Sequence, residues 1–341
     1  MPIVRHLYAD TFGTHIGKYS ERLKLTRGDE TLAQAPLLHL QSVTVASRGV
    51  SISADAIAAC CERGIPITFM DNHGEVYASL YASGLVGTVL TRRAQLLAYT
   101  DWRGVHLAAR IGAGKARSQA ATLRYWARLR RESDPAGEAA LTEAATRILE
   151  YADRIEGTQA AHIGEVRETL MGLEGNAAQH YWAGAGLLVP DSYGWPGRQG
   201  RGATDPVNSL LNYGYGILYA AVERAIILAG LDPYAGFLHA DRPGKPSLVL
   251  DLIEEFRQAA VDRPVFGLLA RRYRADMDAR GRLTDDTRRD FAAKIVEHLE
   301  SAARYDGARV ALRHIIQAQA RAVASFVRGD QEAYTAFVAE S

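Results

Sequence analysis

Residues 236–257 contain a histidine and, on an expected helix, three carboxylates whose types suit the binding of a divalent cation. The segment reads GFLHADRPGKPSLVLDLIEEFR, with His239 in a connection and Asp251, Glu254 and Glu255 on the polar face of an expected helix. At about 100° per residue, Asp251 lies about 60° from Glu254 and about 40° from Glu255, so either pair is able to approach one ion. Spacing alone therefore does not choose between Glu254 and Glu255. Acids in a first helical turn also suit the helix dipole without any metal.

A further carboxylate that could join this group is Glu174, in the segment LEGNAAQHYW. It interrupts an apolar helical pattern, and a buried carboxylate keeps its charge only beside a cation or hydrogen-bond donors. The alternative is an exposed glutamate. Carboxylate oxygens with one imidazole suit Mg²⁺ or Mn²⁺ better than zinc, and such an ion would polarise a phosphodiester and stabilise its leaving oxygen.

Positive charge is concentrated in one part of the chain, although the overall balance is close to zero. The 341 residues include 40 Lys and Arg against 39 Asp and Glu, but between Arg92 and Arg131 ten basic residues accompany a single acid, Asp101. Clustered Lys and Arg are the groups that contact nucleic-acid phosphates. The alternative is a solvated helix surface whose charges pair with acids elsewhere in the fold.

The elements that must position these residues divide the chain into a small β-rich part and a large helical part. A short helix at 53–65, with Ser53 as its N-cap and Gly64 at its end, interrupts the strands. The segments with strand-like alternation are 6–26, 37–47, 65–71 and 71–81. The segments with a helical period are 90–99, 121–131, 139–155, 166–184, 207–231, 247–261, 289–300 and 309–327.

These patterns predict an α+β fold with a small N-terminal β-rich domain followed by a large all-α catalytic domain. We place the β domain at 1–84, a linker at 85–88 and the helical domain at 89–341. The long connection 187–206, rich in glycine, proline and arginine, is expected to be a mobile cationic loop.

Cysteine use and hydropathy favour a cytoplasmic protein. The only cysteines, Cys60 and Cys61, are adjacent, which strains a disulfide between them and leaves no ligand set for structural zinc. The N-terminus lacks a basic start followed by an apolar run, and the uncharged stretch 206–222 is interrupted by polar residues. We expect neither export nor a membrane span.

Four ordered motifs carry a resemblance to a known family. LEGNAAQHYW, PVNSLLNYGYGILY, GFLHADRPGKPSLVLDLIEEF and VDRPV, in a chain that passes from β to α structure, resemble the CRISPR-associated Cas1 integrases over essentially the full length. The resemblance implies that Glu174, His239 and Glu254 are the catalytic and metal-binding residues, with Asp251 as a second acid available to the same metal. It selects Glu254 over Glu255. Other members carry Asp where this chain has Glu254, which lengthens the reach by one methylene.

The activity that this resemblance implies is DNA integration in CRISPR adaptation, the step of antiviral defence that captures foreign DNA. The 3′-hydroxyl ends of a captured fragment would attack a phosphodiester at the edge of a CRISPR repeat, in a reaction that depends on Mg²⁺ or Mn²⁺. If water replaces the hydroxyl, the same site would cut DNA as an endonuclease. No covalent protein nucleophile is needed.

Several other residues are expected to contact double-stranded DNA, in the captured fragment or in the repeat. Solvated turn residues, a helix cap and a packed tyrosine are the alternatives for some of them. The DNA-binding candidates are Arg92, Arg93, Asn208, Tyr213, Arg242, Lys245 and Arg257.

Attack at both ends of a repeat requires two active sites a fixed distance apart, so an oligomer is expected. The resemblance implies a homodimer that pairs through its β domains, with two dimers bridged by Cas2 in a heterohexamer-type complex. Two other functions remain open. A metal-dependent phosphohydrolase acting on nucleotides would share the ligands but not need the basic stretch. A non-catalytic DNA-binding scaffold would keep the basic stretch but not the ligands.

Overall fold

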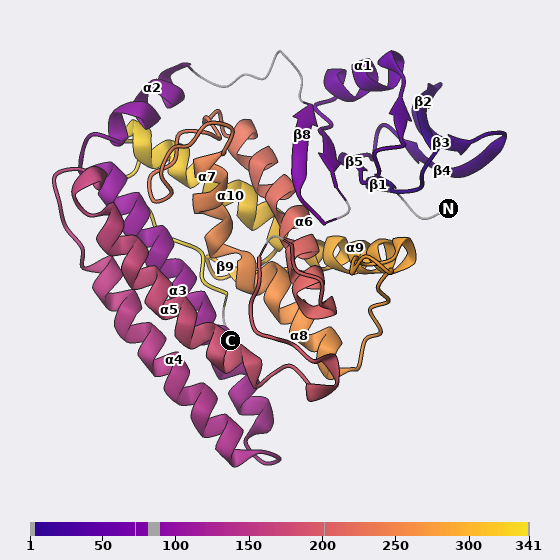
Figure 1. Cartoon of the computed structure of the whole chain (residues 1–341). Coiled ribbons are helices and arrows are strands. Elements are labelled where there is room, and N and C mark those ends of the chain that lie inside the picture. The colour runs from indigo at the N-terminus through magenta and orange to yellow at the C-terminus, as the bar shows by residue number, and fades with distance from the viewer. Residues whose placement is uncertain (1–3, 72, 81–88, 201, 340–341) are drawn as a thin grey trace.

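The computed structural model describes residues 4–71, 73–80, 89–200 and 202–339. These residues form a β-rich N-terminal part beside a larger helical part, which confirms the expected order (Figure 1). The expected domain boundary at residue 84 and the linker over 85–88 lie outside the described residues. In the described part, no helix combines the length and the apolar character needed to cross a membrane.

Two four-stranded sheets and one helix make up the N-terminal part. One sheet has the order β1-β5-β7-β8, in which β1, β5 and β7 run parallel and β8 is antiparallel; the other has the order β4-β3-β2-β6. The helix lies within the predicted segment 53–65. Ser53 is its N-cap, as predicted, because the Ser53 side chain accepts a hydrogen bond from the Ala56 N–H at 3.2 Å. The bounds are β1 His6–Ala9, β2 His15–Tyr19, β3 Arg22–Arg27, β4 Glu30–Pro36, β5 Ser42–Val45, β6 Ser51–Ile52, α1 Ala54–Glu62, β7 Ile67–Met70 and β8 Val76–Leu80.

The helical part is built from three long neighbouring helices packed beside a central group. Helices α3, α4 and α5 lie side by side, while α6 and α10 pass through the middle of the molecule (Figure 1). Helix α6 contains the uncharged stretch 206–222, and it is buried on most sides, as expected for a mainly apolar helix in a core. The bounds are α2 Val89–Ala98, α3 Trp102–Arg130, α4 Pro135–Glu156, α5 Arg167–Gly186, α6 Pro206–Leu228, α7 Ser247–Leu252, α8 Arg263–Ala270, α9 Asp285–Glu300, β9 Ala302–Tyr305, β10 Ala308–Ala311 and α10 Leu312–Arg328.

Two element predictions were wrong at their N-terminal ends. Helix α3 begins at Trp102, well before the predicted residue 121, because its first half is rich in Ala and Gly and is buried on several faces, so it shows no amphipathic period. Residues 309–311 belong to strand β10, which pairs with β9 in an antiparallel hairpin, and α10 starts only at Leu312.

The predicted helix 247–261 is not continuous. Helix α7 ends at Leu252, a 3₁₀ turn covers Ile253–Glu255, and a π-helical segment covers Gln258–Asp262 before α8 begins. The Asp262 carboxylate accepts hydrogen bonds from the hydroxyls of Tyr181 (2.6 Å) and Tyr215 (2.5 Å). These contacts come from α5 and α6, so the irregular backbone is fixed by residues distant in sequence.

The two parts of the molecule meet across α6 and α9. The hydroxyl of Tyr8 on β1 hydrogen-bonds to the hydroxyl of Tyr213 on α6. Gly74, in the turn before β8, lies directly on α6: a Cβ added at Gly216 would come 1.6 Å from the Gly74 carbonyl oxygen, so only glycine fits there. Asp10 adds an ion pair to Arg289 of α9 at 3.0 Å.

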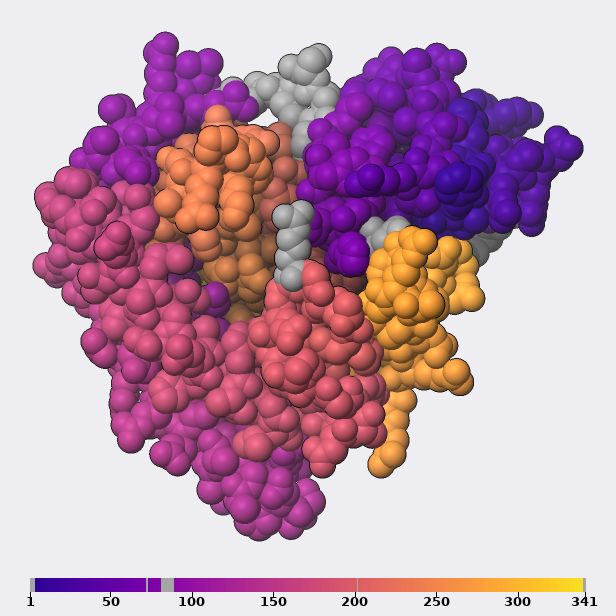
Figure 2. Space-filling view, in the orientation of Figure 1, coloured from indigo at the N-terminus to yellow at the C-terminus, as the bar shows by residue number. Residues whose placement is uncertain are grey.

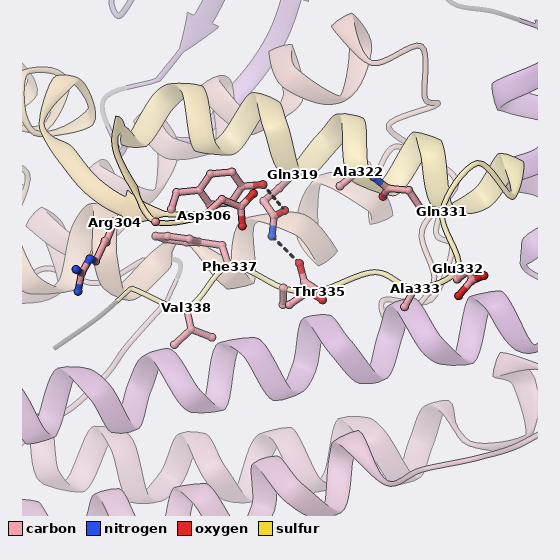
Figure 3. A pocket seen from close by; sticks show the side chains of 13 residues that line it. Arg304, Asp306, Gln319, Ala322, Gln331, Glu332, Ala333, Thr335, Phe337 and Val338 are labelled. Carbon is pink, nitrogen blue, oxygen red and sulfur yellow. Dashed lines mark hydrogen bonds between the residues drawn. The ribbon is translucent and has the colours of Figure 1, made fainter.

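The C-terminal segment after α10 returns along the helical part. In Figure 3 it runs between α10 and α3, beside a cavity of about 780 Å³. The Gln319 amide on α10 donates to the Thr335 carbonyl at 3.0 Å and to the Glu255 carboxylate at 2.9 Å. The segment is therefore attached to the same 3₁₀ turn that carries Glu254.

Candidate metal and DNA site

Lys115 joins two of the predicted metal ligands. Glu174 lies on α5 and Glu254 lies in the 3₁₀ turn after α7. From α3, the Lys115 Nζ forms an ion pair with Glu174 Oε1 and lies 2.6 Å from Glu254 Oε2. The side chains of Lys115, Glu174 and Glu254 are only 14%, 16% and 5% exposed. The structure thus gathers the two glutamates around one positive charge that is largely shielded from water.

Arg257 supplies a second positive charge to Glu254. Its Nε lies 3.1 Å from Glu254 Oε1, and its guanidinium carbon lies 4.5 Å from the centre of the Tyr215 ring. Burial alone would raise the pKa of Glu254, but Arg257 and Lys115 outweigh burial and lower it. Burial alone would lower the pKa of Lys115, but Glu254 and Glu174 raise it. These two pKa shifts favour the charged forms of Glu254 and Lys115, and Arg257, predicted to contact DNA, is held inward at Glu254.

Asp251 orders the loop that carries His239. Its Oδ2 accepts the backbone N–H groups of Phe237 at 2.6 Å and Leu238 at 3.0 Å. Its Oδ1 accepts the His239 N–H at 2.8 Å and lies 2.7 Å from the His239 Nδ1. Asp251 is fully buried, and both oxygens are committed to this loop. The prediction that Asp251 is a further metal ligand is therefore not supported, and its contacts are those of a residue that positions His239.

His239 is oriented by this contact. Because Asp251 engages Nδ1, the second ring nitrogen, Nε2, is the one left for another ligand. Burial alone would lower the pKa of His239, but the hydrogen bond to Asp251 and the charges of Asp251 and Glu254 raise it. Glu254 and Lys115 both act on the His239 ring electrostatically: the Glu254 charge raises the pKa of His239 and the Lys115 charge lowers it.

Glu254 and Glu255 point to different parts of the molecule. Glu255 is fully buried and accepts hydrogen bonds from the Tyr334 hydroxyl at 2.5 Å and the Phe337 N–H at 2.8 Å. Burial raises the pKa of Glu255 to about 7, although these hydrogen bonds oppose the shift. The choice that spacing left open is therefore resolved by the structure: Glu254 faces Glu174, whereas Glu255 binds the C-terminal segment.

Asn208 and Tyr213 are fully buried in this structure, so neither side chain reaches the surface, and their contact with DNA stays a prediction. The Asn208 amide donates to the carbonyl of Gly197 at 2.8 Å and its oxygen accepts the Gln199 N–H at 2.9 Å, which ties the preceding loop to α6. The cap of α6 is Asp205, which accepts the Asn208 N–H at 2.9 Å. Tyr213 serves the contact between the two parts of the molecule.

The other DNA-binding candidates lie on the surface. Arg92 and Arg93 are exposed on α2, and Arg242 and Lys245 are exposed on the loop between His239 and α7. In Figure 2 the orange surface of the segment after α6 borders the magenta-to-red surface of α5 and the loop that follows, with a hollow between them.

The basic stretch divides between residues that form ion pairs and residues that carry unpaired surface charge. Several of its residues pair with acids: Arg103 with Asp101, Arg110 and Arg117 with Glu156, Lys115 with Glu174 and Glu254, and Arg130 with Asp134. The others make no ion pair with any described residue: Arg92, Arg93, Arg124, Arg128 and Arg131. Part of the stretch therefore pairs with acids of the fold, and part remains as surface charge that is available to phosphates. Lys115 was counted only as charge, and nothing in its local sequence marks it as part of the site.

The donor set fits a hard divalent cation. Two carboxylates and one imidazole nitrogen are ligands that Mg²⁺ and Mn²⁺ accept, and a cationic group already lies between the carboxylates. Within the described residues, no three His, Cys, Asp or Glu side chains are grouped so as to hold a metal ion directly. Glu174 and Glu254 share the Lys115 ammonium instead, so metal binding at these residues stays a prediction.

Comparison with known proteins identifies the family of this chain. Residues 7–297 match the family model for CRISPR associated protein Cas1. The chain is 38% identical to CRISPR-associated endonuclease Cas1 1 of Archaeoglobus fulgidus over 97% of this chain and 99% of that protein. Its fold resembles that of a casposase bound to integration product (TM-score 0.81, 20% identity, 97% and 93% of the two chains). It also resembles a chain of a Cas6-RT-Cas1–Cas2 complex (TM-score 0.78, 20% identity, 99% and 37%). The chain therefore belongs to the CRISPR-associated Cas1 family.

Proposed function

We propose that this protein is an integrase and endonuclease of CRISPR adaptation. It joins the 3′-hydroxyl ends of captured DNA to the phosphodiester backbone of a CRISPR repeat, and it cuts DNA when water takes the place of the hydroxyl. One observation carries the proposal: Glu174 and Glu254 converge on a single shielded cationic position, that of the Lys115 ammonium. Family membership supports the same reaction class.

In this proposal, Glu174, Glu254 and His239 hold Mg²⁺ or Mn²⁺. When bound, the ion polarises the phosphodiester and stabilises the charge that develops on the leaving 3′ oxygen. Asp251 keeps His239 in place by accepting its backbone N–H and engaging Nδ1, which presents Nε2 to the ion. Arg257 neutralises one oxygen of Glu254. The attacking group comes from the DNA, so the protein positions and neutralises rather than forming a covalent intermediate.

The exposed basic residues bind the phosphates of the DNA. Arg242 and Lys245 lie a few residues after His239, where they are suited to hold phosphates beside the reacting bond. Arg92 and Arg93 lie on α2, at the start of the helical part, and are suited to contact the captured duplex. The β-rich part up to residue 84 is assigned to dimerisation and residues 89–341 to catalysis.

The partners follow from the reaction. Two strand transfers at opposite ends of a repeat need two sites, so we propose a homodimer. We also propose an assembly with Cas2, because a solved chain that resembles this one comes from a Cas6-RT-Cas1–Cas2 complex. A cytoplasmic location suits a protein that works on DNA. A phosphohydrolase acting on nucleotides remains the second candidate, because it would use the same ligands, but it gives no role to the exposed Arg92 and Arg93.

The experiment that tests this function is integration of a duplex oligonucleotide into a supercoiled plasmid that carries a CRISPR repeat. It is run with Mg²⁺, with Mn²⁺ and with a chelator, each with and without Cas2. Replacing His239 with Ala should abolish integration and leave binding of the duplex largely intact, because the imidazole is a metal ligand rather than a DNA contact. The matched control is His162→Ala, since His162 is exposed and lies outside the cluster.

Full integration by His239→Ala would overturn the assignment of the metal site. Turnover of mononucleotides without any reaction on duplex DNA would favour the phosphohydrolase. Duplex binding without any metal-dependent reaction in the unmodified protein would leave only a scaffold.

A further inference from the structure

A lysine lies at the position that a metal ion shared by Glu174 and Glu254 would need. The Lys115 ammonium contacts Oε1 of Glu174 and Oε2 of Glu254. The other oxygen of Glu254, Oε1, faces Arg257 at 3.1 Å. Both oxygens of Glu254 are thus engaged by cationic side chains. A divalent ion that bound both glutamates would meet a positive charge already in place.

The ammonium and the ion exclude each other on electrostatic grounds. Like charges a few ångströms apart repel strongly where the surroundings are shielded from water. Conversely, without a cation between them the two carboxylates would repel each other in a site largely shielded from water, and only Glu254 would keep a cationic neighbour, Arg257. One cation must therefore lie between Glu174 and Glu254, and the structure places Lys115 there.

The Lys115 side chain is able to move away from the two glutamates, whereas the Arg257 side chain is held in place. A lysine ammonium is a compact charge on a flexible stem of four carbons, and its side chain keeps 14% of its surface exposed, which leaves a way toward water. The Arg257 guanidinium is packed over the Tyr215 ring as well as paired with Glu254. The exchange of one cation for another therefore concerns Lys115.

We propose that Lys115 is an internal counter-ion of the metal site, which holds Glu174 and Glu254 together when no metal is bound and must be displaced for the metal to bind. This inference rests on the proposed function, since it uses the same ligands. Its consequence is that the metal affinity of the protein is set by a competition. The ammonium lowers the affinity for the metal and keeps the ligands folded in place without it.

The experiment measures Mn²⁺ binding itself, by calorimetry and by the loss of the free-ion electron paramagnetic resonance signal, at one fixed pH. Lys115→Met removes the competing charge and keeps the length of the side chain. It should bind Mn²⁺ roughly tenfold more tightly or better than the unmodified protein, because the ion no longer has to displace an ammonium. Lys115→Arg keeps the charge and should show no such gain.

Thermal unfolding gives a second readout on the same variants. Without metal, Lys115→Met should unfold at a lower temperature than the unmodified protein, since the two carboxylates lose their counter-ion. Mn²⁺ should raise its unfolding temperature by more than it raises that of the unmodified protein. If Lys115→Met does not fold, Lys115→Gln, which keeps a polar end without the charge, carries the same two measurements.

The outcomes separate this inference from the function on which it rests. Equal or weaker Mn²⁺ binding by the uncharged Lys115 variants would overturn the competition and make Lys115 a permanent support of the site. His239→Ala should weaken Mn²⁺ binding in the unmodified background. If His239→Ala binds Mn²⁺ as tightly as the unmodified protein, the metal site itself is wrong, whatever the Lys115 variants show.

Discussion

Replacing Asp251 with Asn tests how the His239 loop is held. The substitution keeps the shape of a fully buried side chain and removes its charge. The carboxylate accepts from two backbone N–H groups at one oxygen, and from the His239 N–H and Nδ1 at the other. An amide offers one oxygen, so whichever way Asn is turned, two of these four contacts face an NH₂ group that does not accept.

The size of the effect follows from those two contacts. A hydrogen bond to a charged group contributes about 1.5–3 kcal/mol, so the loss of two predicts a fall of about 3–6 kcal/mol in the free energy of unfolding. With an unfolding entropy of about 2.1 cal/mol/K per residue, that fall corresponds in a chain of 341 residues to a decrease in unfolding temperature of roughly 4–8 °C. Hydrogen exchange at the amides of residues 237–239 should accelerate, because these groups lose their acceptor.

The matched control is Asp55→Asn, an exposed acid in the first turn of α1, for which only a small change is expected. The measurement is thermal unfolding of both variants with hydrogen exchange followed at the same amides. If Asp251→Asn unfolds within 1 °C of the unmodified protein and the three amides keep their protection, the assigned role of Asp251 is refuted.

Lowering the pH should loosen the C-terminal segment at His106, whose Nε2 lies 3.1 Å from the Tyr334 nitrogen and 3.2 Å from the Tyr334 carbonyl oxygen. Protonation of Nε2 removes the acceptor for the Tyr334 N–H, although the protonated ring is able to donate to the carbonyl. Burial holds the pKa of His106 below its ordinary 6.5, so the stabilisation by the neutral ring is complete above pH 6.5 and is lost as the pH falls from there through the lowered pKa. The measurement is hydrogen exchange of the Tyr334 amide, corrected for the intrinsic rate, which should become faster at low pH. Constant protection of this amide would contradict the prediction. Replacing Arg92 and Arg93 together with Ala should weaken duplex binding and reduce the slope of log affinity against log salt by up to about 2, as measured by fluorescence anisotropy. Arg147→Ala on α4 is the control, and a slope unchanged in the double variant would show that neither arginine contacts DNA.

The order of strands and helices could be predicted because it depends on local patterns. Alternation over β5 and β7 and the 3.6 period over α4, α5 and α9 are visible within single segments. The first half of α3 was missed, since a helix buried on several faces shows no polar side. The break between α7 and α8 depends on tyrosines of α5 and α6 that bind Asp262, and no local signal announces them.

The candidate site was predicted only in part for the same reason. Residue types identified Glu174, His239 and the acids near 254, but their roles depend on partners elsewhere in the chain. Glu254 differs from Glu255 because Lys115 on α3 contacts the first and Tyr334 contacts the second. Tyr213 is buried because Tyr8 of the β-rich part lies against it. A list of residue types contains none of these distant contacts.

The 3₁₀ turn Ile253–Glu255 connects the C-terminal segment to the predicted metal site. One of its glutamates is anchored by Tyr334 and Phe337, and the adjacent one belongs to the cluster with Glu174. A force on the segment of Tyr334 and Phe337 would therefore reach Glu254, a predicted metal ligand, through the peptide bond that joins it to Glu255. Affinity tags and fusion partners are consequently better attached at the N-terminus, where they exert no force on the 3₁₀ turn.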